Sequence, residues 1–134
     1  MASPAKSTEL EMGPREGEFL ISEGNGRISR DEIVVKDQTA VLQTATVIGQ
    51  VAADDEYNQL TPGAADGSQV AAGILYRRTN VNGQSARALA ITRKAEVNGL
   101  LLVWPDGITG PQKTQAISEL EAAGIIIRNQ DSGQ

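Results

Sequence analysis

Short apolar segments separated by polar and glycine-containing segments recur along most of this 134-residue chain. This pattern predicts short strands at residues 19–21, 27–35, 41–51, 57–60, 70–77 and 86–92, and in the last of them large and small side chains alternate. Glycine-containing segments between them, Gly24-Asn25-Gly26 and Asn82-Gly83, are typical of turns. Short strands at near-regular spacing indicate a β-rich, barrel-like module.

The last third of the chain predicts one helix and a closing strand. Thr109 and Gln112 have the spacing of a capping box, and Pro111 suits the first turn of a helix. The expected helix covers residues 111–123, and its apolar side consists of Ala116, Ile117, Leu120 and Ala123. Gly124 suits the left-handed position after a helix, and residues 125–127 predict a buried strand.

An apolar run from Leu100 ends at Trp104, the only tryptophan. Pro105 keeps Trp104 out of the helical region of backbone conformation. A tryptophan beside an apolar run is typical of a core residue, and a Trp-Pro pair can also present an amphipathic ring to a neighbouring subunit. The residues alone leave both interpretations open.

Residues 1–17 differ in composition from the rest of the chain. Residues 1–17 are rich in Ala, Ser, Thr, Pro and Glu and show no apolar period, so they cannot bury enough surface to offset the cost of ordering them. We therefore predict an extended or disordered N-terminal arm over residues 1–17, a single domain over 18–128 and a flexible tail over 129–134. The expected fold class is α+β and β-dominated, a small barrel-like domain with one short C-terminal helix.

Composition narrows the possible partners. A formal net charge of −5 argues against nucleic acid as a partner, because phosphates require Lys and Arg. No apolar run approaches the roughly 18 residues of a membrane span, and residues 1–18 lack the apolar centre of a signal peptide. Aromatic residues make up only 3% of the chain, so the core must rely on thin side chains, which favours oligomerisation. We expect synthesis in the cytoplasm and no membrane partner.

Candidate chemistry is sparse. The chain has no Cys and no His, which excludes disulfides and Ser–His or Cys–His nucleophile pairs within one chain. Gly24-Asn25-Gly26 begins like a dinucleotide loop but lacks the third glycine, which favours a turn. Asp54-Asp55-Glu56 could attract a hard cation, but adjacent charges are typical of a solvated turn. We predict no catalytic, cofactor or metal residues, and no enzyme.

Three blocks of sequence carry a resemblance to a known family. Residues 18–23, 66–75 and 97–128, in this order, resemble the lambda-type head decoration proteins of tailed phages. The resemblance implies a structural protein that binds as a trimer at local threefold positions on the outer surface of the expanded head. There it would stabilise the shell against the pressure of packaged DNA. The implied partners are the major capsid protein and further copies of the chain, with no small-molecule substrate, and the implied location is the outer capsid surface of the virion.

The resemblance also gives hypotheses for contact residues. The segment Gly17, Glu18, Phe19, Leu20 and Ile21, together with the arm before it, is expected to bind the capsid protein. An arm of this kind could add a strand to an exposed edge of the shell.

Trp104, Pro105 and Ile108 are expected near the trimer interface. A threefold ring requires a heterologous contact that closes.

A different class of function remains open. Residues 44–51 are also similar to small barrel modules such as lipoyl-like carriers, although no lysine follows on a tight hairpin tip. The alternative is therefore a small soluble β-barrel that binds a ligand or acts as a carrier, and it would require a concave apolar pocket.

Overall fold

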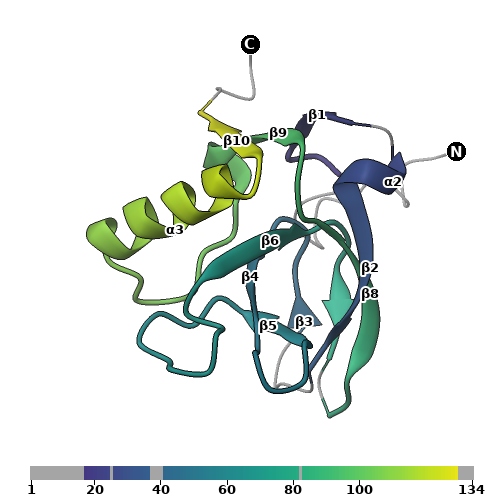
Figure 1. Cartoon of the computed structure of the whole chain (residues 1–134), viewed down its shortest axis with the longest axis vertical. Coiled ribbons are helices and arrows are strands. Elements are labelled where there is room, and N and C mark those ends of the chain that lie inside the picture. The colour runs from purple at the N-terminus through teal and green to yellow at the C-terminus, as the bar shows by residue number, and fades with distance from the viewer. Residues whose placement is uncertain (1–16, 25, 37–40, 82, 130–134) are drawn as a thin grey trace, which may run out of the picture.

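A closed barrel of five short strands forms the body of the protein (Figure 1). The computed structural model describes residues 17–24, 26–36, 41–81 and 83–129, so most of the predicted arm and tail lies outside the described residues. The barrel strands, in their order around the barrel, are β2 (Arg30–Val35), β5 (Tyr57–Gln59), β4 (Val47–Gln50), β6 (Ala71–Leu75) and β8 (Ala86–Ile91). All pairs are antiparallel except β2 with β5. The β-dominated, barrel-like fold expected from the sequence is confirmed.

A second sheet and one long helix lie against the barrel. The sheet has the order β1 (Leu20–Glu23), β9 (Ala95–Asn98), β10 (Ile125–Arg128), with β1 antiparallel and β10 parallel to β9. Helix α3 (Gly110–Ala122) precedes β10 and contacts both β10 and β6. The remaining elements are α2 (Gly26–Ser29), β3 (Val41–Leu42), β7 (Thr79–Asn80) and the 3-10 helix η1 (Gly99–Leu101).

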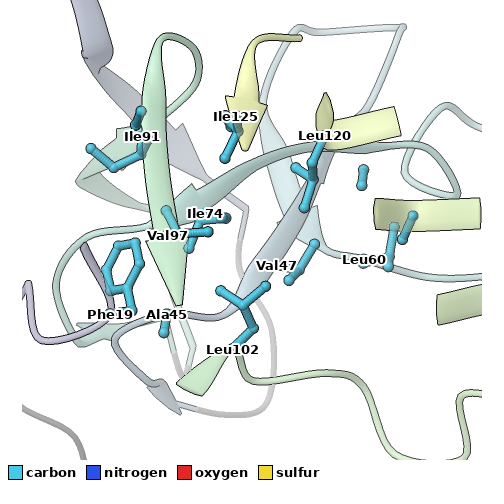
Figure 2. Packing of buried hydrophobic residues seen from close by; sticks show 13 residues of the cluster. Phe19, Ala45, Val47, Leu60, Ile74, Ile91, Val97, Leu102, Leu120 and Ile125 are labelled. Carbon is cyan, nitrogen blue, oxygen red and sulfur yellow. The ribbon is translucent and has the colours of Figure 1, made fainter. Parts of the chain in front are cut away.

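Two apolar clusters lie on opposite faces of the barrel strands. Successive residues of β4 and β6 go to different clusters: Val47 and Ile74 belong to one, Ile48 and Leu75 to the other, as the period of two in a strand requires. All five barrel strands contribute to the Ile48 cluster, which therefore fills the interior. The other cluster joins the barrel to the second sheet and α3 through Phe19, Val97, Leu120 and Ile125, among others (Figure 2).

The signals around α3 are largely confirmed. The Thr109 hydroxyl accepts from the Gln112 amide at 3.2 Å, and the Gln112 side chain accepts from the Thr109 amide at 2.9 Å. Gly124 follows the helix with a φ of +93°. Two details differ from prediction. Ala123 is exposed because it caps the helix, and Ile126 is 45% exposed because β10 buries only one face.

The predicted strand over 27–35 is too long. Residues 26–29 form the single turn α2, where the buried Ser29 hydroxyl accepts from the Gly24 amide at 2.8 Å and donates to the Lys94 carbonyl at 2.8 Å. A side chain that bonds the backbone in this way competes with strand pairing. The strand therefore begins only at Arg30.

The predicted strand over 41–51 is divided in two. Ala45 has a φ of +74° and separates β3 from β4. Its amide donates to the Leu75 carbonyl at 2.8 Å, while its carbonyl accepts from the Val103 amide at 2.9 Å. The chain thus changes its hydrogen-bonding partners at Ala45. The sequence does not predict this change, because alanine rarely adopts a left-handed conformation.

Candidate functional site

Phe19 attaches the start of the described chain to the core. Its side chain is 1% exposed, and its carbonyl accepts from the Asn98 amide at 2.7 Å. Its ring meets the Tyr76 ring edge-on, with 6.3 Å between centroids and 68° between planes. Edge-to-face aromatic pairs add stabilisation beyond the burial of area. Phe19 therefore fixes where strand β1 begins.

Gly17 makes a tight turn just before this anchor. Its φ is +75°, and its carbonyl accepts from the Leu20 amide at 3.0 Å. A Cβ at Gly17 would lie 2.8 Å from the Tyr76 hydroxyl oxygen. Both the conformation and the available space therefore require glycine at this position. The turn sets the point at which the preceding residues join the domain, and we call Gly17, Phe19 and Tyr76 the arm base.

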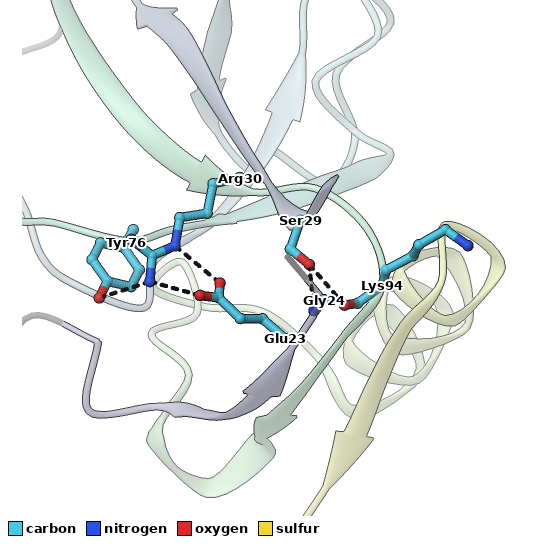
Figure 3. A network of polar contacts seen from close by, with 6 residues as sticks. All are labelled: Glu23, Gly24, Ser29, Arg30, Tyr76 and Lys94. Atoms are coloured by element: carbon cyan, nitrogen blue, oxygen red, sulfur yellow. Dashed lines mark hydrogen bonds and ion pairs between the residues drawn. The ribbon is translucent and has the colours of Figure 1, made fainter. Parts of the chain in front are cut away.

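A charged network holds the arm base against the barrel (Figure 3). Arg30 donates from Nε and Nη2 to the two Glu23 oxygens at 2.9 and 2.8 Å, a bidentate pair. The Arg30 guanidinium carbon also lies 4.2 Å from the centre of the Tyr76 ring. The hydrogen bond to Glu23 raises the pKa of Arg30, against the opposing effect of burial. Strand β1 is thus tied to β2 and to the end of β6.

Strand β1 is an edge strand with a β-bulge. Leu20 pairs with Val97 and Ser22 with Glu96, so Ile21 is the extra residue and is 37% exposed. A bulge on an edge strand redirects a side chain and increases local twist. Here it places an apolar side chain at the surface beside the arm base.

The outer face of the second sheet continues from the bulge. Glu96 accepts from the Ser22 hydroxyl and from Arg128 Nε, both at 2.9 Å. These two bonds, Ser22 first, lower the pKa of Glu96. Ile126 is paired in register with Glu96. We call Ile21, Ser22, Glu96, Ile126 and Arg128 the outer sheet face.

The five residues expected to bind the capsid do not share one environment. Glu18 and Ile21 are exposed, Gly17 and Leu20 are half-buried, and the Phe19 side chain is in the core. Sequence reasoning missed Glu23, Arg30 and Tyr76, which hold this segment in place. No local pattern marks them, because Tyr76 is far from the other two in the sequence.

Trp104, Pro105 and Ile108 lie together on the connection that leads into α3. All three are half-buried, and Trp104 and Ile108 pack against the Phe19-containing cluster. The Pro105 carbonyl accepts from the Ile108 amide at 3.3 Å. Lys113 Nζ lies 5.6 Å from the centre of the Trp104 ring. Trp104 is therefore neither a fully buried core residue nor a free surface one, and its place at a subunit interface stays a prediction.

The acidic segment 54–56 is a turn. Asp54 pairs with Lys36, and Asp55 has a φ of +62°. Within the part of the chain that the structure describes, no group of three or more acidic, His or Cys residues is placed to hold a metal ion. None of the helices in the described residues has the length and apolar content to cross a membrane.

Comparison of the sequence with models of known protein families identifies the family of this chain. The model of the family "bacteriophage lambda head decoration protein D" matches residues 9–125. The chain belongs to this family. A search of curated proteins returned no match. The lambda head decoration family is structural, which places this protein with the virion and its capsid. The match begins ahead of Gly17 and therefore includes part of the segment that leads into the arm base.

Proposed function

We propose that this head decoration protein binds as a homotrimer at local threefold sites on the outer surface of an expanded phage head. There it holds capsid subunits together against the pressure of packaged DNA, after synthesis in the host cytoplasm. The family match supports decoration of a head. The acidic charge of −5 accords with an exterior position that needs no contact with DNA phosphates. The role is mechanical and requires no catalytic group.

The observation that carries this proposal is the arm base. The turn at Gly17 and the buried ring of Phe19 attach the start of the described chain to the domain, and the bulged strand beside them exposes Ile21. We assign Glu18, Leu20 and Ile21, together with the residues before Gly17, to contact with the major capsid protein. Phe19 acts as the anchor of this contact, because its side chain lies in the core.

Strand addition is the mode of binding that suits such a segment. A peptide that adds to an exposed sheet edge gains main-chain hydrogen bonds, with specificity from alternate side chains. Ordering the segment costs conformational entropy, which lowers the affinity of one copy. Three copies on one trimer offset this cost, because binding of the first raises the effective concentration of the others.

Stabilisation of the head then follows from linkage. A ligand that binds only the expanded lattice stabilises it by RT ln(1 + [L]/Kd) at every site. A head offers many equivalent sites, so modest affinity at each adds up to a large preference for the expanded form. A ligand with equal affinity for both forms would shift nothing.

The trimer contact that we propose uses Trp104, Pro105 and Ile108. These side chains form a half-exposed apolar patch, and large aromatic residues are typical anchors of interfaces. We call them, together with Lys113 above the Trp104 ring, the Trp104 patch.

Deletion of residues 1–16 tests the capsid contact. The variant keeps the arm base intact, so it should retain its fold and oligomeric state but lose binding to expanded heads in a sedimentation assay. A matched control, Glu121→Gln, changes one exposed side chain of α3 and should bind like the full chain. Undiminished binding by the deletion variant would refute the assignment.

Comparison of two head forms tests the linkage. The full chain should cosediment with expanded heads and leave compact precursor heads bare. Equal binding to the two forms would remove the proposed mechanism of stabilisation.

A further inference from the structure

The proposed trimer leaves one half of its interface unassigned. In a closed threefold ring every copy meets its two neighbours through two different surfaces. The Trp104 patch supplies only one of them. The second surface must be a region of the same chain that can receive a bulky aromatic ring and a lysine.

Three surface hollows are candidates for the second surface. The first, about 540 Å³, has five carboxylates in its lining, from Asp31, Glu32, Asp54, Asp55 and Glu56. The second, about 600 Å³, includes Arg77, Arg78 and Arg87 in its lining. The third, about 350 Å³, lies between α3 and the residues after β5, and its lining includes Leu60, Pro62, Pro111, Gln115, Ala116 and Glu119. We call the third hollow the α3 groove.

Of these three hollows on the described part of the chain, the α3 groove matches the Trp104 patch best in chemistry. The carboxylate-lined hollow would desolvate several charges against an indole ring, which is costly. The arginine-lined hollow would place Lys113 among like charges. The α3 groove offers Pro62, which is half-buried, and Pro111, which is exposed, to the ring, and a single carboxylate, Glu119, to the lysine.

Glu119 is held in position to receive a cation. One of its oxygens accepts from the Ala71 amide at 2.8 Å, and the other accepts from Gln115 Nε2 at 3.1 Å. Both bonds come from neutral donors, and a carboxylate has further lone pairs that can accept from a third donor. A lysine that arrived with a neighbour's indole ring would meet a preorganised partner.

The two surfaces lie on different sides of one helix. Gln112 lines the α3 groove, and Lys113, the next residue, covers the Trp104 ring. Successive residues of a helix point about 100° apart. The N-terminal half of α3, at the edge of the molecule in Figure 1, therefore separates the two surfaces.

We infer that Trp104 of each copy inserts into the α3 groove of the next copy, with Lys113 facing the neighbour's Glu119. This inference rests on the proposed trimer and specifies how it closes. The contact is heterologous, so every Trp104 patch and every α3 groove is used once in the ring.

Two substitutions on opposite sides of the contact test the inference. Trp104→Ala removes the inserted ring, and Gln115→Trp fills the groove from an exposed position. Each variant alone should become monomeric at concentrations where the full chain is trimeric, with the midpoint of assembly raised at least about tenfold. Glu121→Trp adds the same bulky side chain at an exposed position of α3 outside the groove and should assemble like the full chain. Circular dichroism and thermal melting establish that each variant is folded.

A mixture of the two variants gives the sharpest readout. Trp104→Ala retains an intact groove and Gln115→Trp retains an intact Trp104, so the mixture should form one-to-one heterodimers in native mass spectrometry. These heterodimers cannot close a ring, because the other surfaces are blocked. If Trp104→Ala does not fold, the comparison of Gln115→Trp with Glu121→Trp decides the question.

Failure of the inference is distinguishable from failure of the proposed trimer. A full chain that is monomeric at micromolar concentration would overturn both. A trimeric full chain whose Gln115→Trp variant is also trimeric would overturn only the insertion of Trp104 into the groove.

Discussion

Substitution of Phe19 by alanine is the strongest perturbation of the arm base. Full burial of a phenylalanine contributes about 1.5–3 kcal/mol by transfer alone, and the cavity left by Phe→Ala raises the cost to about 3–5 kcal/mol. The lost edge-to-face contact with Tyr76 is already part of that cost. Because β1 is an edge strand, its detachment limits the loss. We therefore expect the low end, about 3 kcal/mol.

Urea denaturation followed by the fluorescence of Trp104, the only tryptophan, measures this loss at a fixed protein concentration. Phe19→Leu is the matched control and should cost much less, because it retains most of the buried volume. Hydrogen exchange at the Asn98 amide, which bonds the Phe19 carbonyl, should accelerate in the alanine variant. A loss below about 1 kcal/mol would refute the anchoring role of Phe19.

Three further predictions concern single sites. Gly17→Ala should destabilise the fold more than Gly63→Ala in urea denaturation. Both glycines have a positive φ, but only at Gly17 would an added Cβ meet a neighbouring ring, that of Tyr76. Equal losses of unfolding free energy in the two variants would contradict this steric argument. Lys94 has a φ of +52°, which glycine adopts without strain, so Lys94→Gly should raise the free energy of unfolding by about 0.5 kcal/mol, whereas Lys94→Ala should not raise it. A lower free energy of unfolding in the glycine variant would contradict backbone strain at Lys94. The hydrogen bond from Arg93 lowers the pKa of Asp31, so its stabilising contribution is present above about pH 4 and is lost as the pH falls through the lowered pKa. Asp31→Asn should therefore be less stable than the parent at pH 7 in thermal melts, with a gap that narrows below pH 4, and a gap independent of pH would contradict this assignment.

Local signals in the sequence were sufficient for α3. Its capping box, its first-turn proline and the glycine that follows it act within a few residues of one another, so no distant contact is needed to specify them. Strand β6 was predictable because it is a short apolar run that follows the turn residues Asp66 and Gly67, and β8 because Leu89 and Ile91 alternate with smaller side chains.

Elements that depend on distant partners were not predictable. Strand β9 contains Asn98, a buried polar residue whose side chain accepts from the Leu100 amide and starts η1. In the sequence alone, a polar residue of this kind predicts a loop, because its burial depends on residues that are distant along the chain. The change of partners at Ala45 likewise depends on Leu75 and Val103.

The candidate site also combines features that the sequence predicts with features that depend on distant contacts. The segment Gly17–Ile21 could be located from its composition and from the resemblance to decoration proteins. Which of its side chains face outward could not be predicted, because the bulge at Ile21 breaks the alternation of β1. The Glu23–Arg30–Tyr76 network requires the register of two sheets, and the sequence carries no signal for it.

We propose that this head decoration protein acts by binding a phage head at its local threefold positions. Electron microscopy of undecorated expanded heads incubated with the purified full chain tests it most directly. We predict three-lobed density at the local threefold positions of the outer surface. Heads that stay bare, or density at any other position, would contradict binding at the threefold sites.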